Sequence, residues 1–223
     1  MELNQIYLGD CLEVMRNIPD KSIDLVLTDP PYGMSFQSNH RKEKHSKIID
    51  DDNLYWLEDF ILEVKRVKKE DAHVYMFCSM HHVDTFVSLC KKHLNYKNIV
   101  IWHKNNTGMG DLYGDYAPKY EFVIFCSNGD KKLNGKRNSN IKFAKKTGNE
   151  LHPTQKPKEL IGYFINKSSE ENDTILDPFA GSGTTAIACH DLKRNFICIE
   201  KEPEYHAIAT KRYNEAKAQL TLF

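Results

Sequence analysis

Apolar positions along the chain follow two spacings that take turns from one end to the other. Short continuous apolar runs predict buried strands, which we place at 23–27, 73–77, 99–102, 122–126, 174–176 and 196–199. Apolar residues that recur every three or four positions predict helices, which we place at 57–67, 83–90, 160–165, 186–192 and 205–212. Strands that alternate with helices in this way favour an α/β fold, in which helices cover both faces of a mostly parallel sheet.

Two connections are longer than this alternation requires. Residues 127–150 have little apolar periodicity and contain several Asn, Gly and Lys residues, so they predict a loop or a small insertion. Residues 33–53 form the other long connection. Because 223 residues suit one domain of ordinary size, we expect a single domain over residues 1–223 with small insertions at these two places.

The composition is that of a folded protein in a reducing compartment. Hydrophobic residues make up 40% of the chain and charged residues 28%, which argues against extensive disorder. No apolar run approaches the roughly 18 residues of a membrane span, and the N-terminus lacks the features of a signal peptide. The six cysteines form no C-x-x-C pair. We therefore expect a cytoplasmic protein that is neither secreted nor membrane-spanning.

Charge is balanced overall but uneven along the chain. Lys and Arg together number 31, as do Asp and Glu, so no global field draws the protein onto nucleic acid. One stretch nevertheless carries seven basic residues and no acidic residue: Lys131, Lys132, Lys136, Arg137, Lys142, Lys145 and Lys146. This basic stretch is a candidate for contacts with a polyanion. A solvated loop is the alternative.

A glycine-rich segment, which we call the glycine turn, lies between the predicted strand at 174–176 and the next helix. Residues 177–185 read Asp-Pro-Phe-Ala-Gly-Ser-Gly-Thr-Thr, and with Ala186 they match the dinucleotide pattern G-x-G-x-x-G/A. Glu200, at the end of the following predicted strand, can accept hydrogen bonds from both hydroxyls of a ribose. Together they indicate a site for an adenosyl cofactor, either NAD or S-adenosylmethionine. A plain structural turn and a surface glutamate are the alternatives.

A second candidate site, Asp29-Pro30-Pro31-Tyr32, follows the predicted strand at 23–27, at the edge where open α/β sheets bind ligands. An exocyclic amine on a nucleobase carries two hydrogens and a delocalised lone pair. The Asp29 carboxylate and the Pro30 carbonyl can each accept one N–H, which turns the lone pair toward a methyl donor. Tyr32 offers a flat face on which a base taken out of the double helix can stack. An ordinary turn is the alternative.

Histidine spacing bears on metal binding. The ten histidines show no ligand spacing with cysteines or carboxylates. Methyl transfer from a sulfonium requires no metal ion. We therefore expect no metal cofactor.

Six segments, taken in order along the chain, resemble a known family. They are 8–13 (Leu-Gly-Asp-Cys-Leu-Glu), 28–33 (Thr-Asp-Pro-Pro-Tyr-Gly), 101–105 (Ile-Trp-His-Lys-Asn), 152–157 (His-Pro-Thr-Gln-Lys-Pro), 176–185 and 199–205. With these motifs the chain resembles the β-class DNA amino-methyltransferases, which include stand-alone phage and bacterial members. The resemblance implies a Rossmann-like S-adenosylmethionine-dependent methyltransferase fold, in the permuted order that places the catalytic segment before the cofactor turn. It also implies duplex DNA as partner, and such enzymes commonly form homodimers.

The resemblance implies roles for individual residues as well. Pro31 and the rest of the tetrapeptide are catalytic. The implied cofactor-binding residues are Asp10, Cys11, His152, Thr154, Lys156, Asp177, Phe179, Ala180, Gly181, Ser182, Gly183, Thr184 and Glu200. Among them, Asp10 and Cys11 lie at the adenine and Asp177 at the methionine amine. Lys156 lies near the methionine carboxylate, where a cation is electrostatically favourable.

Several of these residues also have a purely structural interpretation. Asp10 and Glu13 match a helix capping box, which is compatible with cofactor binding. His152 can be a loop histidine, and Lys156 can be a solvated surface lysine. Cys11 is expected to act through its backbone.

The first residue of the tetrapeptide bears on the substrate. In the resembled family an aspartate there indicates N6 of adenine, N4-cytosine enzymes usually carry serine, and relatives acting on protein glutamine or RNA tend to carry asparagine. Asp29 therefore favours methyl transfer to N6 of an adenine flipped out of duplex DNA. The basic stretch is the candidate DNA contact. N4-cytosine methylation and, more distantly, an NAD-dependent oxidoreductase on the same fold are the alternatives.

Overall fold

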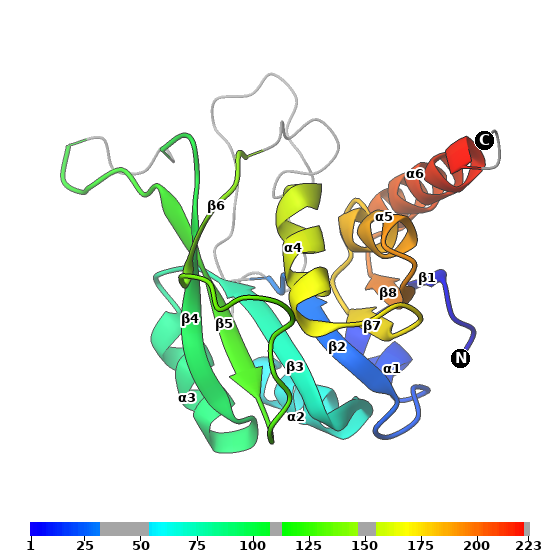
Figure 1. The fold of residues 1–223 in the computed structure, drawn as a ribbon, viewed down its shortest axis with the longest axis horizontal. Helices are drawn as coiled ribbons and strands as arrows, with labels where there is room; N and C mark the ends of the chain where they lie inside the picture. The colour runs from blue at the N-terminus through cyan, green and yellow to red at the C-terminus, as the bar shows by residue number, and fades with distance from the viewer. Residues whose placement is uncertain (32–53, 108–112, 147–154, 221–223) are drawn as a thin grey trace.

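The structure of this protein is a computed structural model, and it describes residues 1–31, 54–107, 113–146 and 155–220. These residues form an eight-stranded sheet in the order β1-β8-β7-β2-β3-β5-β4-β6 (Figure 1). The strands are β1 (Gln5–Leu8), β2 (Ile23–Thr28), β3 (Lys68–Cys78), β4 (Tyr96–His103), β5 (Tyr120–Ser127), β6 (Ile141–Phe143), β7 (Thr174–Asp177) and β8 (Asn195–Glu200). Every strand predicted from an apolar run is present, and the α/β prediction is confirmed.

Most strands of the sheet run parallel. β1, β8, β7, β2 and β3 pair in parallel, whereas β5 is antiparallel to both β3 and β4. The sequence patterns miss two strands, β1 and β6. Both are short and partly exposed, so neither carries the apolar run that marks a buried strand. β6 lies inside the predicted loop at 127–150, while residues 147–150 and 33–53 lie outside the described residues.

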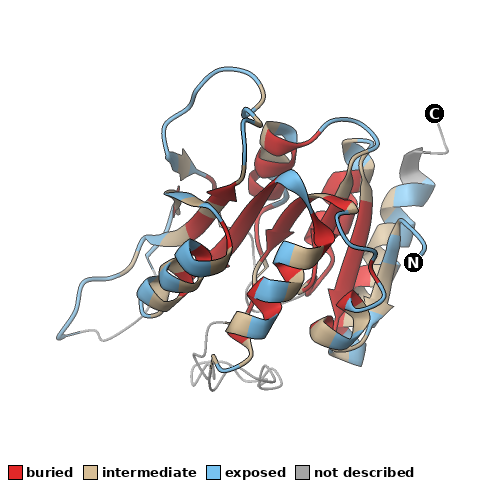
Figure 2. Ribbon diagram, turned by 90° about the horizontal axis from the view of Figure 1, so that it is seen from below, coloured by how far each residue is buried: buried red, intermediate tan, exposed pale blue. Residues whose placement is uncertain are grey.

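Helices cover both faces of the sheet, as predicted. One face carries α1 (Cys11–Met15), α2 (Leu57–Val67) and α3 (Val83–His93), the other carries α4 (Lys158–Ser168) and α5 (Thr184–Asp191), and α6 (Pro203–Leu220) packs against α5, β1 and β8. Successive side chains of a strand point to opposite faces. Val26 of β2 accordingly joins the core under α1–α3, and Leu25 and Leu27 join the core under α4 and α5. Figure 2 shows these buried strands between partly exposed helices.

The ends of four parallel strands meet at one edge of the sheet, which we call the carboxyl edge. β1 and β7 each end beside β8, and β2 ends beside β7. Loops that leave parallel strands at this edge carry the ligand-binding residues of open α/β sheets. Three of the predicted site segments begin there, with Asp10 after β1, Asp29 after β2 and the glycine turn at the end of β7.

The segment after β5 begins at the opposite edge, which we call the amino edge. β5 is antiparallel to β3 and ends at Ser127, which pairs with His73. The chain then packs against the last turn of α4, where Nζ of Lys167 donates to the carbonyls of Asn134 and Lys136 at 2.7 Å each. β6 runs parallel to β4 and carries the chain back toward the carboxyl edge.

Candidate functional site

The glycine turn connects β7 to α5 at the carboxyl edge. Gly181 and Gly183 have positive φ angles of 51° and 79°, which glycine adopts without the strain that other residues carry. The N–H of Gly183 donates to the carbonyl of Ala180 at 2.8 Å, and Gly183 is the N-cap of α5. The N–H of Ala180 donates to Ile199 of β8, also at 2.8 Å. The turn is therefore held by β8 as well as by β7.

Glu200 ends β8 and points into this turn. One carboxylate oxygen accepts the N–H of Gly181 at 2.7 Å, and the other accepts the N–H of Glu202 at 2.9 Å. Glu200 is only 8% exposed, and burial raises the pKa of its carboxyl above the ordinary value. Glu200 is thus not a surface charge, and the structure brings it together with the glycine turn.

Asp177, the last residue of β7, is buried below the turn. Its carboxylate accepts the hydroxyl of Thr185 at 2.5 Å and the N–H of Phe179 at 3.2 Å. Burial raises the pKa of Asp177 from 3.8 to about 6, although both hydrogen bonds act in the opposite direction. Because the ionised carboxylate is poorly solvated here, a cationic group of a ligand is a favourable partner for it.

Asp10 and Cys11 follow β1 on the other side of β8. The Asp10 carboxylate accepts the N–H of Leu12 at 2.9 Å as the N-cap of α1, and it also pairs with Lys201 at 3.2 Å. The capping role predicted for Asp10 is confirmed. Cys11 is buried, and burial raises the pKa of its thiol to about 12, so the thiol is protonated and unreactive near neutral pH.

Three carboxylates thus lie at the ends of the adjacent strands β1, β8 and β7: Asp10, Glu200 and Asp177. Their oxygens suit a ligand that brings hydroxyl groups and a cationic amine, as S-adenosylmethionine does. A dinucleotide such as NAD would instead bring its pyrophosphate to the turn beside the buried Asp177, where like charges repel. These three acceptor groups therefore fit S-adenosylmethionine better than NAD.

The predicted catalytic tetrapeptide begins directly after β2. The Asp29 side chain is 20% exposed, Pro30 is buried and Pro31 is partly buried, while Tyr32 lies outside the described residues. The carboxylate of Asp29 accepts a hydrogen bond from Nζ of Lys156, which lies just before α4. The structure therefore pairs a residue predicted to bind the cofactor with the predicted catalytic aspartate.

Lys156 contacts a second carboxylate, which no sequence pattern singles out. Nζ of Lys156 lies 3.4 Å from Oε2 of Glu121 in β5, and Oε1 of Glu121 lies 3.3 Å from Nζ of Lys104. Burial raises the pKa of Glu121, but the charges of Lys156 and Lys104 outweigh it and hold this pKa below its ordinary value. Burial lowers the pKa of Lys156, but Asp29 and Glu121 hold it above its ordinary value. Ion pairs therefore join Asp29 to Lys156, Lys156 to Glu121, and Glu121 to Lys104, so that negative and positive side chains alternate in one row.

The basic stretch is divided between the two edges of the sheet. Four of its residues lie on the segment that leaves β5 at the amino edge: Lys131, Lys132, Lys136 and Arg137. Lys142 lies in β6, with Nζ 4.3 Å from the centroid of the Tyr163 ring. Lys145 and Lys146 follow β6, where the N–H of Lys146 donates to the Asn105 side chain at 2.7 Å. Of the seven, Lys145 and Lys146 thus share the carboxyl edge with Asp29.

His152 and Thr154 lie outside the described residues. Among residues 1–31, 54–107, 113–146 and 155–220, no group of three or more His, Cys, Asp or Glu side chains could hold a metal ion. No helix within the same ranges is long and apolar enough to cross a membrane.

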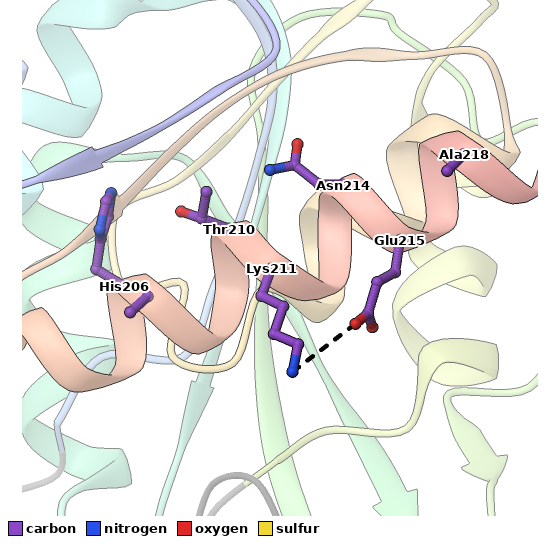
Figure 3. Close-up of a pocket in the computed structure, with 7 residues that line it drawn as sticks. His206, Thr210, Lys211, Asn214, Glu215 and Ala218 are labelled. Carbon is purple, nitrogen blue, oxygen red and sulfur yellow. Dashed lines mark ion pairs between the residues drawn. The ribbon is translucent and has the colours of Figure 1, made fainter.

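A hollow along α6 is separate from these residues. It is lined by His206, Ala207, Thr210, Lys211, Asn214, Glu215 and Ala218 (Figure 3). Lys211 and Glu215, one turn apart on the helix, form an ion pair at 4.0 Å. None of the predicted site residues lines this hollow, so we assign it no part in the site.

Comparison with known proteins covers nearly the whole chain. A family model described as DNA methylase matches residues 23–211. Type II methyltransferase M2.MboI of Moraxella bovis is 30% identical, over 94% of this chain and 87% of that protein. Type II methyltransferase M.HinfI of Haemophilus influenzae is 29% identical, over 96% of this chain and 69% of that protein. The crystal structure of the M1.HpyAVI–SAM complex superposes with a TM-score of 0.74 at 29% identity, over 94% of this chain and 98% of that one.

Proposed function

Since this chain belongs to the N6/N4 DNA methylase family, we propose that it transfers a methyl group from S-adenosylmethionine to N6 of an adenine flipped out of duplex DNA. Family membership makes the chain a DNA methyltransferase and sets aside the NAD-dependent oxidoreductase. The observation that carries the proposed transfer to a base amine is the position of Asp29. It follows β2, the strand next to β7 and its glycine turn.

The glycine turn and the three carboxylates would hold S-adenosylmethionine. Glu200 would accept the ribose hydroxyls, Asp177 the cationic amine, and Asp10 would lie at the adenine. The similarity to M1.HpyAVI, whose structure is a SAM complex, supports this cofactor. When bound, it supplies a methyl group on positively charged sulfur. Carboxylates at the strand ends favour that positive charge.

Asp29 and Pro30 would bind the amine of the target base. The carboxylate of Asp29 accepts one N–H and the carbonyl of Pro30 the other, so that the nitrogen lone pair is freed from the ring and turned outward. As the nitrogen gains positive charge, the Asp29 carboxylate stabilises it and offers a base for the proton that it loses. Tyr32 would stack on the flipped base.

Adenine is the preferred base because an aspartate leads the tetrapeptide, the residue that the family resemblance associates with N6. The amine of cytosine presents the same two donors to Asp29 and Pro30. N4-cytosine methylation is therefore the second candidate function.

Duplex DNA would approach the carboxyl edge, because the flipped base must reach Asp29. We propose that Lys145 and Lys146 bind phosphates there, which helps to offset the few kcal/mol that base flipping costs. Tyr113 and Tyr116, on the connection between β4 and β5, are 99% and 95% exposed. They offer aromatic faces for bases at the same edge.

The test combines one substitution with chemical identification of the product. Purified protein is incubated with S-adenosylmethionine and unmethylated DNA, which is then digested and analysed by nucleoside mass spectrometry. We expect N6-methyladenine from the wild type and a loss of at least about 10³-fold for Asp29→Ala. S-adenosylmethionine affinity should remain within about twofold, because Asp29 binds the base rather than the cofactor.

Asp130→Ala, an exposed carboxylate on the segment after β5, is the matched control and should retain full activity. Full activity of Asp29→Ala would eliminate the role given to Asp29. N4-methylcytosine in the digest would replace the first candidate function with the second. Mapping modified bases in cells free of other methylation would then give the recognition sequence.

A further inference from the structure

We infer that Glu121 and Lys156 position the carboxylate of Asp29, with Lys156 shared between a structural and a catalytic carboxylate. The inference rests on the proposed role of Asp29 in amine binding. Sequence motifs give Glu121 no role and place Lys156 at the cofactor, so both assignments are new.

Separate elements bring these charges to one point of the carboxyl edge. Nζ of Lys156, just before α4, donates to Oδ2 of Asp29, just after β2. The same Nζ lies 3.4 Å from Oε2 of Glu121 in β5. Nζ of Lys104, just after β4, lies 3.3 Å from the other oxygen of Glu121. Lys156 is therefore held from two sides, and Glu121 is itself held by a second cation.

Burial makes this row of charges rigid. The side chains of Lys156 and Lys104 are only 7% and 12% exposed, so neither ammonium can readily exchange its carboxylate for water. Nζ of Lys156 lies 5.1 Å from the centroid of the Phe77 ring, and Nζ of Lys104 lies 5.7 Å from that of Trp102. A lysine enclosed in this way has few other positions, and it fixes the carboxylate oxygen that it binds.

The other titratable groups near Asp29 make a cation necessary. Glu121 and the buried Asp177 are like charges, and the charge of Asp29 adds to the raised pKa of Asp177. Burial, with contributions from Asp29 and Glu121, raises the pKa of Cys78 to about 12, so that thiol is neutral. Among the described residues, Lys156 donates to Asp29, and its charge offsets this local negative charge.

The amine-binding role of Asp29 requires a carboxylate that is ionised and correctly oriented. An ammonium on one oxygen favours the ionised form and fixes the plane of the carboxyl group. Glu121 holds the lysine from the opposite side. Without Glu121, Lys156 would lose its anionic contact on this second side, and its ammonium would hold the carboxylate of Asp29 less firmly.

The test measures kcat for DNA methylation as a function of pH in three variants. In Lys156→Met, Asp29 and Glu121 lose the cation between them, so the acidic limb of the profile moves to higher pH. In Lys156→Met/Glu121→Gln the repulsion is relieved, so the acidic limb returns toward that of the wild type. Glu121→Gln alone lowers kcat about 10- to 100-fold through lost positioning, without an upward shift of the limb.

Affinity for S-adenosylmethionine, measured by calorimetry, distinguishes positioning from cofactor binding. We expect the Kd of all three variants to stay within about threefold of the wild-type value. If the Kd of Lys156→Met rises enough to explain its whole loss of kcat/KM, Lys156 serves the cofactor and the inference is overturned. Lys158→Met, which removes a surface ion pair with Asp191 at 2.8 Å, is the matched control and should behave as wild type.

A charge-balanced variant covers the case in which an unpaired buried lysine prevents folding. Glu121→Gln/Lys104→Met removes one carboxylate and one cation and keeps the Lys156–Asp29 pair, and its kcat should still fall. If the folded Glu121 variants show wild-type kcat and pH profiles, the inference is overturned while the proposed function stands. A wild-type protein that methylates no DNA would overturn the proposed function, and the inference with it.

Discussion

At the scale of single residues, two carboxylates of the carboxyl edge, the buried Asp177 and the partly buried Glu121, differ in their partners. Asp177 is hydrogen-bonded to a hydroxyl and a backbone amide, and its pKa is raised by burial. Glu121 is bound by two ammonium groups, and its pKa is lowered in spite of burial. Neutral donors do not offset desolvation of a carboxylate, whereas adjacent cations do. This difference leads to a prediction for Asp177.

Ionisation of Asp177 should make stability depend on pH. The folded-state pKa of Asp177 is about 6, against 3.8 for an ordinary aspartate, so the folded protein binds the proton more tightly and loses stability as the pH rises through this window. The asparagine side chain in Asp177→Asn cannot ionise, so this variant does not lose stability over the same pH range. Between about pH 5 and about pH 7.5, wild type should lose about 1.4 kcal/mol relative to Asp177→Asn.

Urea unfolding of both proteins at the two pH values measures this difference. Glu159→Gln, a substitution in the first turn of α4, controls for the loss of one carboxylate. An identical pH dependence for wild type and Asp177→Asn would contradict the raised pKa.

At the scale of elements, the glycine turn and α6 depend on each other. The first six residues of α5 are buried, and the helix packs against β8, α4 and α6. The Arg212 side chain of α6 donates to the carbonyl of Ser182 in the turn. A Cβ added to Gly183 would lie 2.9 Å from Cβ and 3.1 Å from Cα of Ala209 in α6. Glycine at 183 is therefore needed for helix packing as well as for the positive φ.

We predict that Gly183→Ala destabilises the protein by about 3 kcal/mol, because it combines left-handed backbone strain with overpacking. Gly129→Ala is the matched control, since Gly129 has φ of 67° but nothing within 4 Å of an added Cβ. Gly129→Ala should destabilise the protein only through the strain of a left-handed backbone, by about 1 kcal/mol. Equal losses in urea unfolding would show that packing against α6 is unimportant.

At the scale of the whole molecule, the path of the chain divides the basic stretch. The segment leaves β5 at the amino edge and returns along β6 to the carboxyl edge, so its two groups of lysines lie at opposite ends of the sheet. A flipped base at Asp29 places DNA beside the second group. Dimerisation stays a prediction.

Salt dependence of DNA binding should distinguish the two groups. Each phosphate contact contributes about 0.9 to the slope of log K against log salt, so Lys145→Ala/Lys146→Ala should reduce the slope by about 1.8. Lys136→Ala/Arg137→Ala, at the amino edge, should leave it unchanged. Fluorescence anisotropy with labelled duplex measures both. A reduced slope in the amino-edge variant alone would place the DNA at the other end of the sheet.

Features that depend only on neighbouring residues can be predicted from the sequence alone. The spacing of apolar positions predicted α2 to α6 and most strands, but not the short α1, since a side chain's face follows from the local period. The glycine turn and Asp29 were identifiable because their chemistry is contained in a few consecutive positions. Glu200 was identifiable from its place at the end of the next strand. β1 and β6 were missed because they are short and carry no continuous apolar run.

Only the tertiary structure decided which distant residues meet. Lys156 and Asp29 are 127 positions apart, and Glu121 is a single polar residue beside the apolar run of β5, so no local pattern links them. The antiparallel path of β5 decided that the basic stretch begins at the amino edge. Local periodicity sets which face of an element is buried, whereas the contacts between elements follow from strand order and direction, which depend on packing of the whole chain.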